Sequence, residues 1–261
     1  MRYIKLFALF LKRSAMLGLE YRANLIGGLF SSVFDVVWSF LATTFLYAYR
    51  DTIGGWSFYE ALVVVGMLFV ASGFLYVVVW PNVQGIIQHV RTGTMDFILT
   101  KPLNSQWYAT LNRFKFESGS SILTGFLLIG YSLFQLGITP DAGRIALFVL
   151  LALGGLVILY ALLTLVVTIS FWAVAVDQVT ELIYVLLETG RYPASAMPQP
   201  LRTLITYIIP IAFISTVPAE VLLGRVTTAA VWLCWVFAAG LLALSIWFWR
   251  VGVRHYGSAS S

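Results

Sequence analysis

The chain has 261 residues, of which 60% are hydrophobic, 16% aromatic and only 10% charged, and its formal net charge is +5. Soluble domains carry about 25% charged residues, so this composition cannot cover a water-facing surface. It excludes a disordered chain, a disulfide scaffold and a nucleic-acid-binding module. It indicates an all-α polytopic membrane protein, in which Lys and Arg mark the cytoplasmic side.

The first predicted element covers residues 2–22, where basic side chains gather near one side of a helix. A helix with one basic and one apolar face typically lies in the membrane interface. We therefore expect an interfacial helix on the cytoplasmic leaflet, with an ordinary basic flank as the alternative. No cleavable signal is expected, because Lys12 and Arg13 interrupt the first apolar run.

Six membrane spans are expected, because about 20 apolar residues cross a hydrocarbon core of about 30 Å. The predicted spans are residues 25–48, 59–80, 118–136, 145–170, 177–191 and 227–249. Residues 81–117 form a polar cytoplasmic loop between the second and third spans. Residues 1–256 thus make up a single transmembrane domain, followed by a flexible tail at 257–261.

The basic residues predict the orientation. Eleven of them lie in the N-terminal segment, in the 81–117 loop and at the C-terminal end, whereas Arg50, Arg144 and Arg225 lie in the other turns. Cytoplasmic segments carry an excess of Lys and Arg. Both termini are therefore expected in the cytoplasm, which requires an even number of spans.

Within residues 192–223, the stretch 201–223 is apolar enough to suggest a further span, but prolines interrupt it. Pro210 and Pro218 each remove a backbone donor and clash with the preceding helical turn. No uninterrupted helix of spanning length remains, so we expect a re-entrant segment that enters the outer leaflet and returns. Irregular backbone at membrane depth persists only where protein or water satisfies it, and the segment should therefore line the mouth of a pathway. The alternative is a plain full span.

Acidic side chains within the predicted spans are candidates for function. Asp35 lies in the middle of the first span, where a charge is costly and normally faces the bundle interior or a wet cavity; the alternative is a carboxyl group satisfied by neighbouring serines. Asp177, Glu181 and Glu188 share one stripe of a helix, which could instead be a solvated face. The candidate pathway or gate residues are Asp35, Asp177, Glu181, Glu188, Pro193, Pro210 and Pro218.

The 81–117 loop is predicted to contain two short helices. Residues 83–91 form the first, and residues 95–101 form the second, which Thr94 can cap and Pro102 ends. A solvated loop would not need the three consecutive apolar residues 97–99. The pattern therefore favours docking into another protein.

Motifs of enzymes are absent from the sequence. There is no H-E-x-x-H, C-x-x-C or G-x-S-x-G motif, and no Lys follows Gly before Ser or Thr as in a phosphate-binding loop. The single cysteine, Cys234, is expected to be a core residue. We therefore expect no enzymatic activity and no cofactor bound by this chain.

Several motifs resemble those of ABC-2 type transporter permeases, most nearly a branch of small six-span bacterial permeases of mostly unassigned substrate. The resemblance rests on residues 20–23 (Glu-Tyr-Arg-Ala), 54–57 (Gly-Gly-Trp-Ser), 91–97 (Arg-Thr-Gly-Thr-Met-Asp-Phe) and 101–104 (Lys-Pro-Leu-Asn). The prolines after the predicted fifth span also fit the pattern of that superfamily. The resemblance extends over essentially the whole chain.

This resemblance implies a permease subunit in the bacterial plasma membrane that pairs with a second copy or a paralogue. Two copies of a separate ATP-binding subunit would hold ATP and Mg, and transport would usually be export. The 81–117 loop would insert into that subunit as a coupling helix. The candidate coupling residues are Arg91, Thr94, Asp96, Phe97, Lys101 and Pro102. The alternative function is an ion-coupled secondary transporter that uses Asp35 and the stripe of Asp177, Glu181 and Glu188.

Overall fold

The computed structural model describes residues 2–20, 22–172, 185 and 187–256. This part of the chain is mostly helical, and four of its helices are long and apolar enough to cross a membrane, or five if a bent pair counts as one span. The expected fifth span lies largely outside the described residues, so the six spans and their orientation stay predictions.

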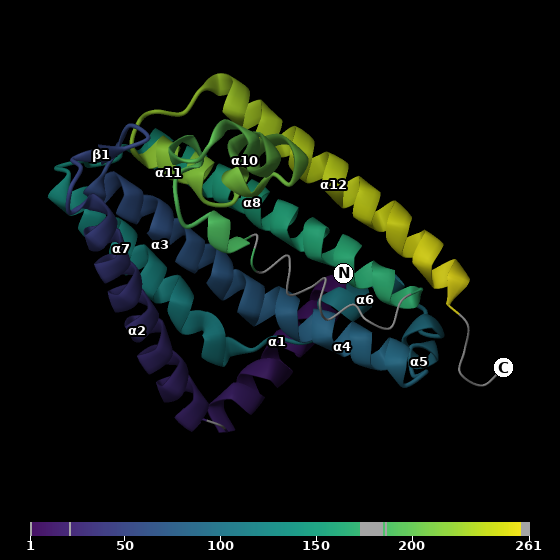
Figure 1. The fold of residues 1–261 in the computed structure, drawn as a ribbon. Helices are drawn as coiled ribbons and strands as arrows, with labels where there is room; N and C mark the ends of the chain where they lie inside the picture. The colour runs from purple at the N-terminus through teal and green to yellow at the C-terminus, as the bar shows by residue number, and fades with distance from the viewer. Residues whose placement is uncertain (1, 21, 173–184, 186, 257–261) are drawn as a thin grey trace.

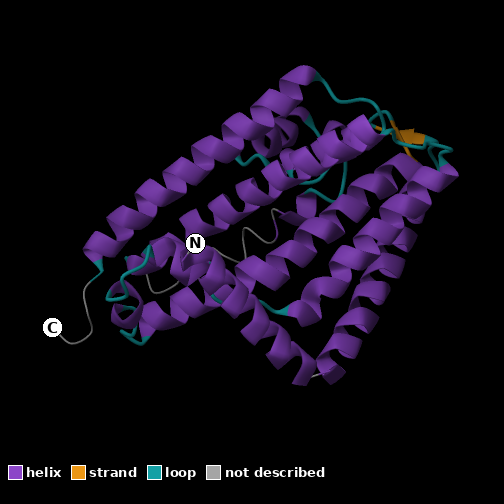
Figure 2. Cartoon of the chain, turned by 180° about the vertical axis from the view of Figure 1, so that it is seen from behind, coloured by secondary structure: helices purple, strands orange, loops and turns teal. Residues whose placement is uncertain are grey.

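The described elements, with η for 3-10 and π helices, follow the chain in this order. They are α1 Arg2–Glu20, α2 Arg22–Tyr47, β1 Thr52–Ile53, β2 Trp56–Ser57, α3 Phe58–Phe74, η1 Leu75–Val79, α4 Trp80–Arg91, α5 Asp96–Leu99, α6 Ser105–Thr110, η2 Phe116–Gly119, α7 Ser120–Gln135, α8 Ala142–Thr168, η3 Ile169–Phe171, η4 Ala194–Ala196, α10 Gln199–Thr203, η5 Leu204–Ile208, η6 Ile211–Phe213, α11 Thr216–Leu222 and α12 Thr228–His255. The long helices lie side by side, with the strands at one end and α5 at the other (Figures 1 and 2).

The N-terminal helix α1 forms a sharp corner with α2 (Figure 1). One side of α1 packs against the segment around α6, where Phe7 meets Phe114 edge to face at 5.5 Å and Phe10 meets Tyr108 at 5.7 Å between ring centroids. The hydroxyl of Ser14 accepts a hydrogen bond from the backbone N–H of Phe114 (3.2 Å). The expected interfacial helix is therefore also held by specific contacts within the chain.

The central element is one continuous helix of 34 residues, Phe58–Arg91, formed by α3, η1 and α4. It does not end at Trp80, where the sequence placed the end of the second span, and residues 83–91 do not form a separate helix. The wider π-helical turn η1 accommodates Pro81, which has no N–H to donate. The carbonyl of Val77, which a regular helix would pair with residue 81, accepts instead from the backbone N–H of Lys115 (2.9 Å).

The third expected span is the helix α7, which crosses α3 at close range because both helices carry glycine at the contact. A Cβ atom added to Gly125 would lie 2.7 Å from the carbonyl oxygen of Gly66, a distance that forces the backbones apart. Small residues allow such close approach in membrane helices. The 16 residues of α7 rise about 24 Å, slightly less than a hydrocarbon core.

We expect Gly125→Ala to destabilise the protein by about 1–3 kcal/mol, because the new methyl group overpacks the α3–α7 contact. Gly130→Ala is the matched control on the same helix, since nothing lies within 4 Å of its added Cβ. Alanine is a better helix former than glycine, so the control should be neutral or stabilising by up to about 1 kcal/mol. Thermal unfolding in detergent measures both, and equal effects would contradict the packing role of Gly125.

The helices α8 and α12 lie along each other (Figures 1 and 2). Close contact again involves a glycine, since a Cβ on Gly154 would lie 2.7 Å from the sulfur of the fully buried Cys234. The Asp141 side chain caps α8 by accepting from the backbone N–H of Arg144 (2.9 Å), and this hydrogen bond lowers the pKa of the Asp141 carboxyl group. Cys234 is thus a core residue.

Residues 50–57, expected only as a turn, contain a short antiparallel hairpin in which Ile53 pairs with Trp56. Gly54 and Gly55 have φ values of 59° and 83°, the left-handed conformation that a two-residue hairpin turn requires. A Cβ on Gly54 would also lie 2.5 Å from the Cα of Ala196. The hairpin therefore packs directly against the segment that precedes α10.

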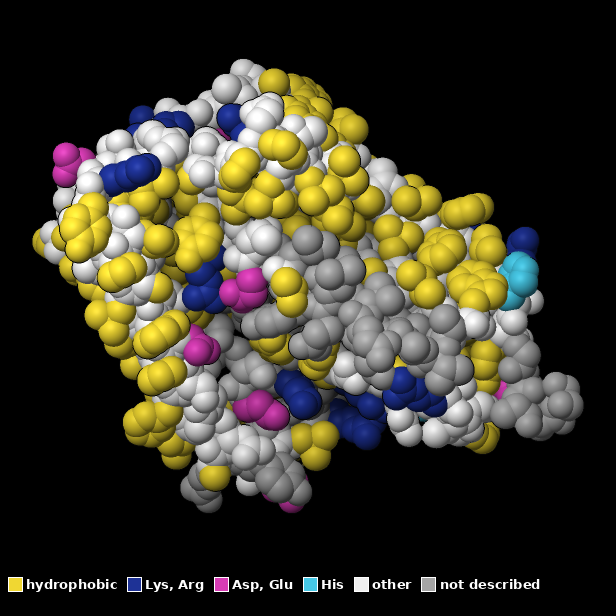
Figure 3. Space-filling view, viewed as in Figure 1, with side chains coloured by type: hydrophobic (Ala, Val, Ile, Leu, Met, Phe, Trp, Pro, Cys, Tyr) yellow, Lys and Arg dark blue, Asp and Glu magenta, His cyan; other side chains and the backbone are white. Residues whose placement is uncertain are grey.

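Hydrophobic side chains cover most of the face in Figure 3, and charged side chains gather near its ends and in a strip across its middle. The helix α2 contributes much of this apolar surface, with Phe30, Phe34, Trp38 and Phe45 each more than 60% exposed. Such a surface requires lipid or protein around it.

Candidate functional site

The side chain of Asn82 connects the C-terminal part of the central helix to the segment that follows α6. Its buried side chain donates from Nδ2 to the carbonyl groups of Val78 (2.6 Å) and Arg113 (2.8 Å). Its Oδ1 accepts from the backbone N–H groups of Asn112 (3.2 Å) and Arg113 (3.1 Å). All the hydrogen-bonding capacity of the amide is therefore used. Asn82 was not among the expected functional residues; its position directly after a helical proline is the signal that could have identified it.

The turn between α4 and α5 contains the residues expected to contact an ATP-binding subunit. The hydroxyl of Thr94 lies 2.8 Å from His89 Nδ1 and 2.8 Å from the hydroxyl of Thr92. Because the Thr94 side chain is used within the turn, it does not cap the following helix as the sequence predicted. That helix, α5, has Met95 as its N-cap and runs from Asp96 to Leu99, shorter than the expected 95–101.

The short helix α5 has one buried and one exposed side. Met95 and Ile98 are buried, whereas Phe97 between them is 71% exposed. The helix is thus anchored in the protein core and holds an aromatic ring outward. This arrangement suits an apolar contact with a partner protein.

The other expected coupling residues lie at the same end of the molecule. Arg91 is exposed at the last position of α4, and Asp96 is half-buried at the start of α5. The Lys101 ammonium group donates to the hydroxyl of Tyr108 and lies 3.9 Å from the centre of its ring. Pro102 is exposed in the turn before α6.

Segments far apart in the sequence also meet at this end. Trp249 of α12 donates from Nε1 to the hydroxyl of Ser105 in α6 (3.1 Å). The backbone N–H of Asn104 donates to the hydroxyl of Tyr3 in α1 (3.3 Å). The start of α1, the end of α12 and the turn between α4 and α5, named the coupling turn after the expected role of its residues, are therefore on one side, as Figure 1 shows for α5, α6 and α12.

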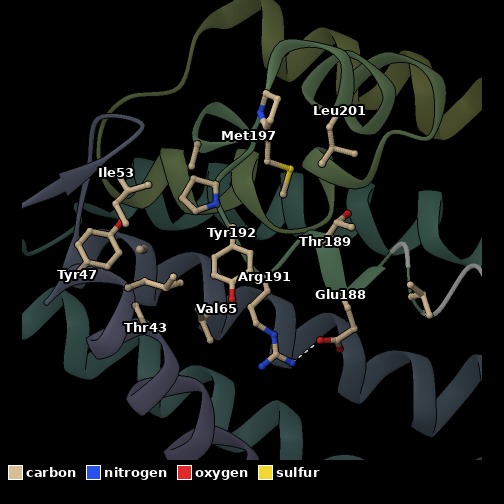
Figure 4. Close-up of a pocket in the computed structure, with 16 residues that line it drawn as sticks. Thr43, Tyr47, Ile53, Val65, Glu188, Thr189, Arg191, Tyr192, Met197 and Leu201 are labelled. Atoms are coloured by element: carbon tan, nitrogen blue, oxygen red, sulfur yellow. Dashed lines mark hydrogen bonds and ion pairs between the residues drawn. The ribbon is translucent and has the colours of Figure 1, made fainter. Parts of the chain in front are cut away.

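A cavity of about 610 Å³ lies nearer the hairpin end, between α2, α3 and the segment 185–201. Its size is in the range of small-molecule pockets. Apolar and aromatic side chains dominate its lining, among them Val65, Tyr192 and Met197 (Figure 4). Its charged lining residues are Glu188 and Arg191, whose side chains point toward each other in Figure 4.

Glu188 and Arg191 form an ion pair that joins this cavity to α2. Arg191 Nη2 lies 2.5 Å from Glu188 Oε2, and Nη1 donates to the hydroxyl of Ser39 (2.8 Å). Asp35, one helical turn before Ser39, lines a smaller cavity of about 120 Å³ together with Glu188 and Arg191. The structure thus brings together two of the expected pathway residues, Asp35 and Glu188, and adds Arg191, to which the sequence assigned no role. Ser39, one of the neighbouring serines that could have satisfied the Asp35 carboxyl group, accepts a hydrogen bond from Arg191 instead.

The prolines expected at the pathway have different roles. Pro193 is buried and lines the larger cavity. Pro210 lies at the break between the helical pieces Gln199–Ile208 and Ile211–Leu222, which are bent by 72°. The expectation that Pro218 also breaks the helix is wrong, because it is the third residue of α11, where its missing N–H has no intrahelical partner to lose. Asp177 and Glu181 lie outside the described residues.

Both ends of the bent segment contact the same hairpin. The Ser195 hydroxyl donates to the carbonyl of Gly54 (3.1 Å), and Arg225 Nη1 donates to the carbonyl of Gly55 (3.1 Å). Arg225 Nη2 also lies 2.5 Å from Glu60 Oε1 at the start of α3. The chain between Ser195 and Arg225 therefore leaves one end of the molecule and returns to it.

Comparison with known proteins places this arrangement in a family. The profile of the family described as "ABC-2 family transporter protein" matches residues 33–260. The chain belongs to the ABC-2 transporter family. Searches of curated proteins and of solved structures gave no match.

Membership in the ABC-2 transporter family makes the chain a multi-pass membrane permease with a role in transport. Permeases of this family are generally non-enzymatic membrane components that pair with an ABC ATP-binding subunit. The resemblance inferred from the sequence motifs is thereby confirmed. In the described chain, the coupling turn and the cavity of about 610 Å³ are the two candidate sites for an ABC-2 permease function.

Proposed function

We propose that the chain is the permease subunit of an ABC exporter in a bacterial plasma membrane and forms half of a translocation pathway. The observation that supports this proposal most strongly is the continuity of the central helix. It joins the coupling turn at Arg91 to Ala61 and Val65, which line the 610 Å³ cavity. A helix of 34 residues is about 50 Å long. A partner that displaced α5 would therefore shift this helix as a unit, and with it the residues that line the cavity.

The exposed apolar surface of α2 supports the presence of a second permease copy or paralogue. Its outward aromatic residues, such as Phe34 and Trp38, would pack on that partner or on lipid. A charge at mid-membrane is costly in lipid, so Asp35 on the same helix would face the pathway between the two permeases. The cavity lined by Tyr192 and Met197 would receive an apolar or amphiphilic substrate.

ATP hydrolysis is assigned to a separate subunit, two copies of which would bind ATP and Mg. The chain has no phosphate-binding loop. We expect the purified chain to hydrolyse no ATP by itself and to stimulate hydrolysis when co-purified with its ABC ATP-binding subunit. Robust ATP turnover by the isolated chain would contradict the proposal. Ion-driven transport by the isolated chain in liposomes would favour the alternative, a secondary transporter.

The return of the chain to the hairpin between Ser195 and Arg225 supports a re-entrant segment with its ends outside the cell. We expect a cysteine at the exposed Gln199 to react with an impermeant thiol reagent added to intact cells. The background is Cys234→Ala, and Cys234 itself is buried. Thr100→Cys, at the coupling end, is the matched control and should react only in opened membranes. The reverse pattern would overturn the proposed orientation.

A further inference from the structure

A third cavity, of about 770 Å³, lies between α1, the start of α4 and the segment 112–115. We name it the basic groove, because it is lined by four cationic side chains. These are Arg13, Lys101, Arg113 and Lys115. The groove is lined by no Asp or Glu, and within the described chain the side chains of Arg13, Arg113 and Lys115 form no hydrogen bond or ion pair. Among the residues that the structure describes, none neutralises this positive charge through an ion pair.

The segment that carries two of these cations is fixed at successive backbone groups. Asn82 binds both the N–H and the carbonyl of Arg113, Ser14 accepts from the N–H of Phe114, and the carbonyl of Val77 accepts from the N–H of Lys115. In an extended segment, side chains two positions apart point the same way. Arg113 and Lys115 are both exposed, whereas Phe114 between them is buried. The two charges are thus presented together by a rigid backbone.

The wall opposite Arg113 is shaped for its guanidinium group. Gly85 of α4 faces it, and a Cβ at that position would lie 3.2 Å from Arg113 Nη1. The absence of a side chain at Gly85 therefore leaves room for the guanidinium group beside the helix. Planar guanidinium groups bind phosphate oxygens through paired hydrogen bonds.

The aromatic side chains of the groove indicate its depth in the membrane. Trp80 and Tyr108 line it together with the cations. Trp and Tyr concentrate at the level of lipid headgroups, and basic pockets between membrane helices on the cytoplasmic side bind anionic headgroups. An aromatic and basic lining, with no carboxylate among the described lining residues, matches the chemistry of a phosphodiester attached to an apolar tail.

We propose that the basic groove binds the headgroup of an anionic phospholipid, with Arg113 and Lys115 as the principal phosphate ligands. The lipid would lie between α1 and the coupling turn and hold α1 against the central helix. The site needs no ATP-binding subunit, so it can be tested on the purified full chain whether or not the proposed transport function holds.

The test measures retention of phosphatidylglycerol and of phosphatidylethanolamine on the detergent-purified chain by native mass spectrometry. We expect the double variant R113Q/K115Q to lower the affinity for phosphatidylglycerol by about tenfold or more, because each basic residue near an anionic lipid contributes several-fold. The matched control is K5Q/K12Q, which removes two charges from α1 outside the groove. The conservative variant R113K/K115R should retain most of the binding and shows that the site is intact.

Three results would overturn the proposal. They are equal losses in R113Q/K115Q and K5Q/K12Q, equal retention of phosphatidylethanolamine by the unmodified chain, and displacement of phosphatidylglycerol by inorganic phosphate at millimolar concentration. The last result would identify a free-anion site. An unchanged thermal unfolding midpoint of the lipid-free R113Q/K115Q variant in detergent, relative to the lipid-free chain, shows that a loss of lipid does not reflect unfolding.

Discussion

The Phe97→Asp variant is expected to lower the amount of ATP-binding subunit that co-purifies with the chain by about tenfold or more, while membrane insertion stays normal. The ring of Phe97 is 71% exposed, but its helix is anchored by Met95 and Ile98, which are buried. Burial of such an aromatic residue at the centre of an interface typically contributes more than 2 kcal/mol. A carboxylate in its place would have to be desolvated against an apolar groove.

Thr100→Asp is the matched control for this variant. It adds the same charge at another exposed position one residue after α5 and removes no aromatic ring. Quantitative co-purification and ATP-dependent transport are the two measurements. If both variants bind the subunit and transport equally well, α5 is not the coupling element. The central helix that ends at Arg91 would then not transmit motion from the ATP-binding subunit.

The Asn82→Leu variant is expected to have the largest effect on stability, on the order of 2–4 kcal/mol, although the two side chains are similar in size. The amide holds Val78, Asn112 and Arg113 through four hydrogen bonds. Buried polar groups left without partners cost about 1–3 kcal/mol each, and some of these backbone groups would regain water. A thermal midpoint lower by about 5–10 °C should follow in detergent.

Gln84→Leu is the control, because Gln84 is exposed on the same helical segment and no hydrogen bond of its side chain is lost. Its midpoint should change little. Asn82→Leu should also reduce phosphatidylglycerol retention, since Asn82 fixes the backbone of Arg113. A midpoint unchanged by Asn82→Leu would show that the 112–115 segment is held by its aromatic packing alone.

Local features of the sequence were sufficient for several elements. A low charge content and long apolar runs predict membrane helices, and α8 and α12 occupy the regions expected for two of them. Asp141 and Thr227 cap these helices through their own side chains, accepting from backbone groups three residues later. Such caps depend only on residues close in the sequence. The motifs around the coupling turn predicted the family correctly for the same reason.

Where the sequence analysis failed, the structural context of a residue overrode its local preference. Pro81 favours a helix end, but the π-helical turn and the N–H of Lys115, more than thirty residues later, compensate for its missing hydrogen bond. Threonine is a residue type that commonly caps helices, but the Thr94 hydroxyl is hydrogen-bonded to His89. Pro210 breaks its helix, whereas Pro218 does not, because only the position in the helix decides whether a lost donor matters.

By itself, the sequence determined that this protein is a multi-pass membrane permease of the ABC-2 family, because composition, apolar run length and short motifs are properties of the chain. The tertiary structure determined which charged side chains lie near one another. Asp35 shares a cavity with Glu188 and Arg191, and Arg13, Arg113 and Lys115 line one groove. Charge pairing and cavity shape depend on how separate helices pack, and packing is set by close contacts such as Gly66 with Gly125 that no single segment specifies.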